Sequence, residues 1–492
     1  MSQNLFARLA QRFEPRSELD RREFLKVAIA ASSGVLLSGP EAFAAKAHSR
    51  RGARRVVVVG GGFSGLACAH ELMSAGCHVT VLEARNRVGG RVLSFHDLVK
   101  GKSIEGGGEF IGSNHPTWLA YSRKFHLELF PGSADENVDE PLSLDGQIVD
   151  LKKARAVYEE MKVVNNHMTA DAKNVNADEP WTSPGASELD RRNVARWLRD
   201  VPVSRWCKLA WGAQLAGNNG ASLARQSYLG NLAMVKGGGL DKYWTDSELY
   251  RCRGGNQSLA FKLAESLGEN LRLGMPVAAI ETTSDRVTVR CANGEVFEGD
   301  DVVLSVPPTV WHQIRIEPAL PHGLRPQMGV AVKYLPVVSD RFWEEKHLGS
   351  GALTDGMVSM TWDATDGQHG KAAVLVGFSG GPAAETCRRR WASSGDRAYQ
   401  TELEKIYPGY GKHFVRSRFM DWPSDHWVQA SYSFPAPGEV MKIGPVLRAG
   451  AGRLHFAGEH TCYAFVGYME GALHSGVATA RRVLKAGAAV PA

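Results

Sequence analysis

The chain has 492 residues, of which 43% are hydrophobic and 22% are charged, an ordinary globular composition with room for two domains. The formal net charge of +6 comes entirely from residues 1–55, which hold eleven Lys/Arg and five Asp/Glu. The remainder is neutral and has no basic stripe, so we expect no nucleic-acid partner. The seven cysteines are odd in number and form no C-x-x-C pair, so neither a metal site nor a disulfide framework is expected.

The N-terminal stretch has the pattern of an export signal. Residues 20–26 (DRREFLK) contain paired arginines, residues 27–37 are mildly apolar, and residues 42–44 (AFA) are typical of a cleavage site. We therefore expect residues 1–44 to be a twin-arginine signal peptide outside the fold, followed by a linker at 45–53. Export in the folded state by the twin-arginine export machinery would make this a periplasmic or secreted bacterial protein. The alternative is an unprocessed N-terminal helix or membrane anchor. No later stretch is long and apolar enough for a stable membrane span.

A dinucleotide-binding unit is predicted directly after the linker. Four valines at 56–59 indicate a strand buried on both faces, and a G-x-G-x-x-G pattern at 60–65 leads into helix formers at 66–72. The glycines thus lie at a strand-to-helix turn, where a helix N-terminus can bind a phosphate. A second strand at 78–82 ends in an acid, placed to reach a ribose hydroxyl. The alternative is that the glycines serve packing alone. This interpretation is the weaker one, because strand, glycines, helix, strand and acid follow each other in the order of a dinucleotide-binding unit. The expected cofactor-binding residues in this unit are Gly60, Gly62, Phe63, Ser64, Gly65 and Glu83.

Three further motifs resemble those of the flavin-containing amine oxidase family, which includes monoamine, polyamine and L-amino-acid oxidases. They are residues 83–91 (EARNRVGGR), 457–461 (AGEHT) and 467–472 (GYMEGA). The resemblance implies a bound FAD, with Arg91 approaching its phosphates and flavin edge and Glu459 bonding its ribityl chain. A carboxylate that only caps a helix is the alternative for Glu459. The further cofactor-binding residues that the resemblance implies are Ala84, Arg85, Gly90, Gly107, Glu109, Phe110, Val277, Gly458, Gly467, Tyr468 and Met469.

The same resemblance suggests catalytic residues. Lys333 matches the family pattern M-G-x-x-x-K, in which the lysine holds a water against the flavin, although a lysine in a strand is more often simply solvated. Tyr432 and Tyr468 match two aromatic rings that stand on the flavin and sandwich the substrate amine; two core tyrosines are the alternative. Animal monoamine oxidases carry a cysteine that bonds the flavin where this chain has Ser431, so the FAD should be non-covalent.

The substrate class depends on the loop after the paired glycines. Venom-type L-amino-acid oxidases place an arginine there to hold the substrate carboxylate, whereas the matching residue here is Phe110, preceded by Glu109. An acid in the cavity would favour a cationic amine such as a diamine or polyamine. A plain loop carboxylate is an equally good interpretation of Glu109. Tyr228, Trp244 and Phe465 are candidate cavity walls, with core packing the better expectation for the first two.

The expected fold is α/β: a discontinuous Rossmann-type (GR2-like) FAD-binding domain with an inserted mixed α+β substrate domain. The FAD-binding domain should comprise residues 54–129, 250–322 and 425–488, and the substrate domain 130–249 and 323–424. A polar, acidic stretch with a turn at Asp145-Gly146 predicts a surface hairpin at 135–150. Helices are predicted at 115–127, 151–173, 188–200, 204–215, 221–235 and 385–406. Strands are predicted at 277–282, 287–291, 300–306, 329–335, 357–363, 372–379, 415–421 and 454–457.

The function implied is oxidation of a small amine to an imine, which hydrolyses to an aldehyde and ammonia while O2 is reduced to hydrogen peroxide. An L-amino-acid oxidase giving a 2-oxo acid is the main alternative, and a flavin desaturase is a remote one. The sequence leaves open which amine is used, whether oxygen or a quinone is the acceptor, whether the chain forms a homodimer, and whether the signal is cleaved.

Overall fold

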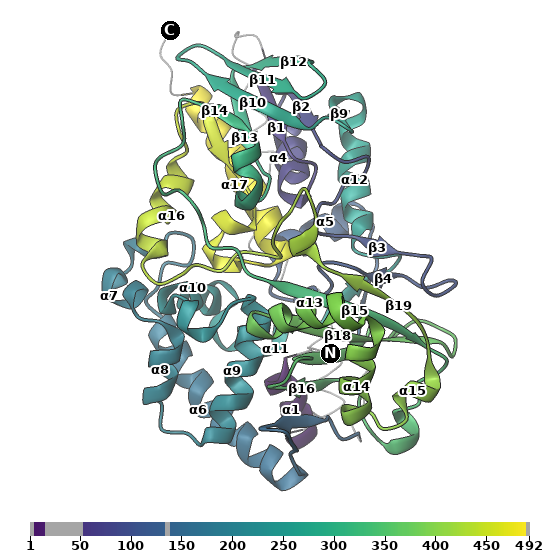
Figure 1. Cartoon of the computed structure of the whole chain (residues 1–492). Helices are drawn as coiled ribbons and strands as arrows, with labels where there is room; N and C mark the ends of the chain where they lie inside the picture. Colours follow the sequence, from purple (N-terminus) through teal and green to yellow (C-terminus); the bar gives the residue numbers. More distant parts are fainter. Residues whose placement is uncertain (1–3, 15–52, 133–137, 489–492) are drawn as a thin grey trace.

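The computed structural model describes residues 4–14, 53–132 and 138–488. These form two domains, seen one above the other in Figure 1. The upper domain contains a parallel sheet of strand order β20-β13-β1-β2-β9, in which the valines of β1 are buried as expected. Three chain segments supply its strands, which are β1 (Arg55–Val59), β2 (His78–Leu82), β9 (Leu271–Arg272), β13 (Asp301–Leu304) and β20 (Leu454–Phe456).

Helices cover this sheet, and a second sheet lies at its far end. Helix α4 (Phe63–Ser74) starts directly after β1, and α17 (Met469–Ala488) packs so closely on it that a Cβ at Gly476 would lie 2.3 Å from the Ser64 carbonyl oxygen. Also in this domain are α5 (Pro116–Lys124), α12 (Gln257–Leu267) and α16 (Glu439–Ala449). The second sheet, of order β12-β11-β10-β14, consists of β10 (Val277–Thr282), β11 (Val287–Cys291), β12 (Val296–Gly299) and β14 (Arg315–Glu317). This arrangement agrees with the expected α/β, Rossmann-type domain.

The lower domain contains a mixed sheet of order β19-β15-β18-β17-β16-β6-β7. Both faces of β15 (Ala331–Val338) are buried: Val332 and Tyr334 pack with α13 and α14, whereas Leu335 and Val337 belong to the larger core that includes α6. The other strands are β6 (Leu142–Leu144), β7 (Gln147–Ile148), β16 (Ala352–Thr354), β17 (Met360–Asp363), β18 (Ala373–Gly380) and β19 (Phe414–Met420). The helices are α6 (Leu151–Ala172), α7 (Ala186–Arg191), α8 (Val194–Asp200), α9 (Arg205–Asn219), α10 (Tyr228–Gly237), α11 (Tyr243–Asp246), α13 (Pro382–Ser394), α14 (Asp396–Ile406) and α15 (Tyr410–His413).

Three expectations about this domain need correction. The helix predicted over 385–406 is two helices, because Gly395 between α13 and α14 adopts φ +52°, which ends the first helix. The helix predicted over 188–200 is likewise two helices, α7 and α8, because Arg192 and Asn193 between them are extended. The hairpin predicted at 135–150 exists as β6 and β7, but it is not an isolated surface feature. Strand β6 pairs with β16 and buries Leu142 and Leu144, so the hairpin extends the sheet.

The N-terminal residues differ most from expectation. Helix α1 (Leu5–Phe13) packs on the lower domain and fully buries Leu5 and Leu9, so the idea that all of residues 1–44 lie outside the fold is wrong for 4–14. The paired arginines and the expected cleavage site lie outside the described residues, and the signal assignment itself stays a prediction. Within the described ranges, none of the helices has the length and apolar character needed to cross a membrane.

Candidate active site

One large cavity runs between the two domains and encloses about 2130 Å³ of space, part of it open to solvent. Every catalytic or cofactor-binding residue predicted from the sequence lines it except Gly65. A Cβ at Gly65 would lie 2.0 Å from the Gly60 carbonyl oxygen, so this glycine allows α4 to pack against the turn, as its place in the pattern predicted. The lining residues named in advance are Gly60, Gly62, Phe63, Ser64, Glu83, Ala84, Arg85, Gly90, Arg91, Gly107, Glu109, Phe110, Val277, Lys333, Tyr432, Gly458, Glu459, Gly467, Tyr468 and Met469.

The glycine turn suits a dinucleotide phosphate. Gly60 has φ +110°, which permits the sharp exit from β1, and Gly62 is the N-cap of α4 without any side-chain cap. A Cβ at Gly62 would meet open space, so nothing in the protein fills the cavity before the free N–H groups of this helix. Glu83 lies beside the turn, where its Oε2 accepts from the Gly61 amide at 2.6 Å. The arrangement therefore fits a cofactor with a pyrophosphate and a ribose.

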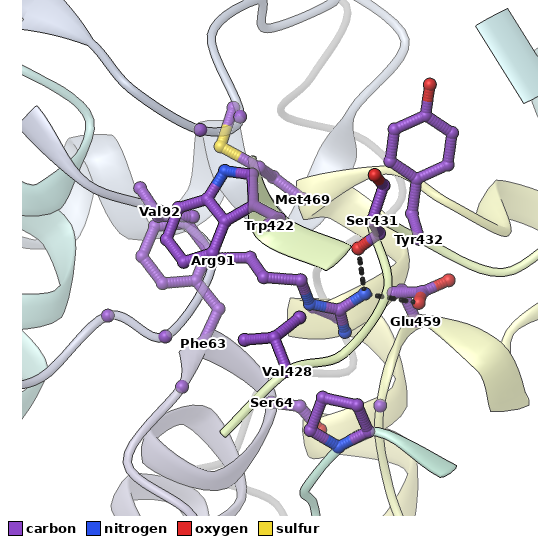
Figure 2. A pocket seen from close by; sticks show the side chains of 18 of the residues that line it. Phe63, Ser64, Arg91, Val92, Trp422, Val428, Ser431, Tyr432, Glu459 and Met469 are labelled. Atoms are coloured by element: carbon purple, nitrogen blue, oxygen red, sulfur yellow. Dashed lines mark hydrogen bonds and ion pairs between the residues drawn. The ribbon is translucent and has the colours of Figure 1, made fainter. Parts of the chain in front are cut away.

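Arg91 and Glu459 form the second fixed feature of the cavity (Figure 2). Arg91 donates from Nη1 to Glu459 Oε1 at 2.9 Å and to the Ser431 carbonyl at 2.7 Å. The other oxygen of Glu459 accepts from Ser433 Oγ at 2.6 Å and from the Gly467 amide at 2.9 Å. Burial alone would raise the pKa of Glu459, but the Arg91 charge and these hydrogen bonds outweigh it and hold the pKa below its ordinary value. The carboxylate thus ties three segments of the cavity wall together.

Lys333 lies in a buried cluster of charges. Its Nζ donates to Glu109 Oε2 at 2.8 Å and to the carbonyls of Gly107 and Glu105 at 2.8 and 3.2 Å. Glu109 Oε1 also accepts from Arg251 Nε at 2.9 Å. Burial acts to raise the pKa of Glu109, yet the charges of Lys333 and Arg251 prevail and keep it below its usual value. Glu109 is therefore a structural counter-ion to two cations, and the idea that it binds the substrate amine loses its basis.

Two tyrosines and a further acid also line the cavity. Tyr432 and Tyr468 line the cavity together with Glu248, which lies between α11 and β8 (Tyr250–Cys252). Burial is the main cause of the raised pKa of both tyrosines, and the negative charge of Glu248 adds to it. The Tyr432 hydroxyl donates to the Gly217 carbonyl at 3.0 Å, and in Figure 2 its ring points away from the Arg91–Glu459 pair.

The basic residues among those lining the cavity are Arg85, Arg91 and Lys333, and each forms an ion pair with an acid: Asp425, Glu459 and Glu109, respectively. The described lining residues therefore offer no uncommitted cation that could hold a substrate carboxylate. They include no cysteine either, which agrees with a flavin held non-covalently.

Sequence reasoning missed several residues of this site. Glu248, Asn218 and Arg251 come from or adjoin the helical block, where no local motif marks them. Of the three candidate cavity walls, Tyr228 and Trp244 are core residues, which was the better expectation for both; Tyr228 is fully buried and donates to Asp171 Oδ2 at 2.6 Å. Phe465 also lies outside the lining and packs edge-on against His115.

Comparison with known proteins agrees with this geometry. Residues 63–484 match the sequence model of the family described as flavin containing amine oxidoreductase. A probable flavin-containing monoamine oxidase A of Dictyostelium discoideum is 26% identical over 455 residues, covering 87% of this chain and 97% of that protein. An L-amino acid dehydrogenase of Synechocystis sp. is 26% identical over 459 residues, with 87% of this chain and 94% of that protein covered.

The solved structure of putrescine oxidase bound to putrescine has the same fold, with a TM-score of 0.81 at 24% identity over 88% of this chain and 99% of that one. The residues matched by the family model include both charged pairs of the cavity wall, Arg91–Glu459 and Lys333–Glu109. The cavity also has the glycine turn and the ribose-binding acid that a flavin dinucleotide requires. The chain belongs to the flavin-containing amine oxidoreductases and is an FAD-dependent enzyme that oxidises amines.

Proposed function

We propose that the chain is an oxidase of small cationic amines, diamines in particular, that passes electrons to oxygen and releases hydrogen peroxide. The observation that carries the substrate class is the set of charged groups that line the cavity. Glu248 lines it together with Tyr432 and Tyr468, whereas the basic groups that line it are all committed to acids. A second ammonium group would be attracted to the Glu248 carboxylate, and a substrate carboxylate would be repelled.

The chain's own residues hold and orient the amine. The rings of Tyr432 and Tyr468 present electron-rich faces that attract an ammonium group and align it as it loses its proton. The raised pKa of both tyrosines keeps their hydroxyls neutral, so neither adds a negative charge that would hold the proton on the amine. Bound FAD supplies the acceptor for the two electrons that leave the C–N bond.

Lys333 supplies positive charge in the wall of the same cavity. Its ammonium is held by Glu109 and two backbone carbonyls, so it keeps a fixed position without reorganisation during the reaction. A fixed positive charge favours any step in which negative charge develops nearby, and reduction of oxygen is such a step. This supports oxygen as the acceptor.

An L-amino-acid dehydrogenase is the second candidate, because a curated relative of that description covers as much of the chain as the monoamine oxidase does. It would need a cation for the substrate carboxylate. Arg251 contacts two residues that line the cavity, but it donates to Glu109 and to the Asp363 carbonyl and lies against the Phe110 ring. We therefore favour an amine over an L-amino acid as the substrate.

The deciding experiment measures peroxide released in air by the purified yellow protein with monoamines, 1,4-diaminobutane, longer polyamines and L-amino acids. We expect peroxide with amines, and kcat/KM highest for a diamine. Turnover of amino acids alone would overturn the substrate assignment. Bleaching of the flavin by amines without peroxide, with turnover restored by a quinone dye, would overturn oxygen as the acceptor.

A further inference from the structure

Helix α1 is built into the substrate domain. Its buried face carries Leu5 and Leu9, which are 0% and 3% exposed, and its two phenylalanines pack around one ring of α6. Phe6 and Phe13 lie 5.4 and 5.9 Å from the centroid of Tyr158. The side chain of Asn4 caps the helix by accepting from the Phe6 amide.

Ion pairs also join α1 and the residue that follows it to the substrate domain. The Arg8 side chain is 6% exposed and donates to Glu140 at 2.8 Å, so a nearly buried cation has its counter-ion across the interface. Lys162 of α6 pairs with Glu14 just after the helix, also at 2.8 Å. Burial of a charge is costly unless a partner is supplied, so the Arg8–Glu140 pair indicates a specific docking arrangement, whereas the exposed Lys162–Glu14 pair adds little.

The start of α1 is connected to the active-site cavity through α9. The Leu5 amide donates to Gln214 Oε1 at 2.7 Å, and Gln214 Nε2 donates to Asn218 Oδ1 at 3.1 Å. Asn218 lines the cavity, and the neighbouring Gly217 carbonyl accepts from the Tyr432 hydroxyl. One backbone N–H of α1 therefore fixes a buried amide that holds the last turn of α9, where the cavity wall and one of the two tyrosines are anchored.

We propose that α1 is a retained part of the working enzyme and a positioning element for its substrate cavity, acting through Gln214 on Asn218 and on the turn that holds Tyr432. Removal of residues 1–44 at the expected cleavage site would strip this element and uncover the buried face of the substrate domain. The active enzyme therefore keeps residues 4–14.

The sharpest test compares Leu5→Pro with Leu5→Ala. Leu5 is the first residue of α1, a position where proline is tolerated, so Leu5→Pro removes the N–H that Gln214 accepts while the helix can still form. Leu5→Ala removes the buried side chain but keeps the N–H. With 1,4-diaminobutane as substrate, we expect KM to be about five-fold higher in Leu5→Pro than in Leu5→Ala, as for one lost hydrogen bond, with kcat equal within about two-fold. Equal KM values in the two variants would overturn the positioning role.

A double-mutant cycle separates this path from general loosening. In a Gln214→Leu background the acceptor is already gone, so Leu5→Pro should add no further rise in KM over Leu5→Ala. An undiminished rise in that background would show that the N–H acts by another path.

Two further measurements need no substrate, so they stand even if no amine is turned over and the proposed function fails. Leu9→Asp should lower the unfolding temperature of the flavin-loaded protein strongly, whereas Arg12→Ala, at an ion pair with the exposed Asp139, should change it little. Equal unfolding temperatures for Leu9→Asp and Arg12→Ala would overturn the docking of α1 on the substrate domain. The intact mass of the flavin-loaded fraction, wherever in the cell it is found, should include residues 4–14, and a fraction that begins at Ala45 would overturn retention.

Discussion

The Lys333 ammonium donates to Glu109 at 2.8 Å, and neither side chain is more than 8% exposed. Two carbonyls of the glycine loop accept the other donors of the lysine, so all three N–H groups are engaged by the protein. A positive charge held so rigidly beside the cavity can stabilise developing negative charge without first turning toward it.

Replacement of Lys333 by methionine should therefore slow the oxygen-dependent step by about 100-fold and leave the amine-dependent step less affected. Rapid mixing of the amine-reduced enzyme with oxygen, and of the oxidised enzyme with amine under nitrogen, measures the two steps separately. Lys102→Met is the matched control, because Lys102 is also buried and donates to backbone carbonyls but does not line the cavity. Equal losses in both steps for Lys333→Met would contradict the assigned role.

Glu248→Gln should raise KM for 1,4-diaminobutane by about 10-fold, since about 1.4 kcal/mol of attraction to a second ammonium is lost. For a monoamine of similar length the change should stay within about two-fold, because that substrate has no second charge. Glu265→Gln, at an exposed ion pair on α12, should change neither value. Equal effects of Glu248→Gln on diamine and monoamine would remove the basis for a diamine preference.

Glu105 makes stability depend on pH. Burial is the largest cause that raises its pKa from 4.5 to about 7, and the nearby charge of Glu109 adds to it. Because the folded-state pKa is the higher one, this carboxyl contributes stability that is fully present below pH 4.5 and is lost as the pH rises through 7. In Glu105→Gln, the amide can still accept from the Asn256 N–H and donate to Ser94 Oγ, so the variant mimics the protonated acid. Between pH 5 and pH 8, we expect the unfolding temperature of the wild-type protein to fall more than that of Glu105→Gln. An equal fall in the two proteins would contradict this prediction.

Acid precipitation of the protein should leave all of the flavin in the supernatant, where its absorbance and mass identify unmodified FAD. Ser431 stands where animal monoamine oxidases are expected to carry their flavin-bonding cysteine, and its hydroxyl donates to the Ala331 carbonyl at 2.8 Å. Flavin that remains with the precipitate would contradict non-covalent binding.

The local motifs predicted most of the cofactor end of the cavity, because turns such as Gly60 to Gly65 are determined by a few adjacent residues. The charged cluster could not be predicted in this way. Arg251 lies 142 residues from Glu109 in the chain, and Lys333 lies 224 residues from it. Only the fold therefore shows that one carboxylate pairs with two cations. The sequence accordingly left the role of Glu109 open.

The N-terminal helix shows a different limit. Nine amphipathic residues ahead of paired arginines look the same whether they belong to a signal or to a folded domain, and only the docking surface on α6 distinguishes the two. Gly395 is a third case, because the apolar spacing continues across it and hides the change from one helix to the next.

The parallel sheet takes its strands from widely separated parts of the chain, and this sets an order for biosynthesis. Strand β20 (Leu454–Phe456) pairs with β13, and α17 (Met469–Ala488) closes on α4, so elements made long after the first glycine turn complete the domain that this turn began. A nascent chain that stops before β20 has the phosphate-binding turn but lacks both Glu459 and Met469 in the cavity wall. Cofactor loading must therefore follow synthesis of α17, and a chain truncated before β20 should be colourless.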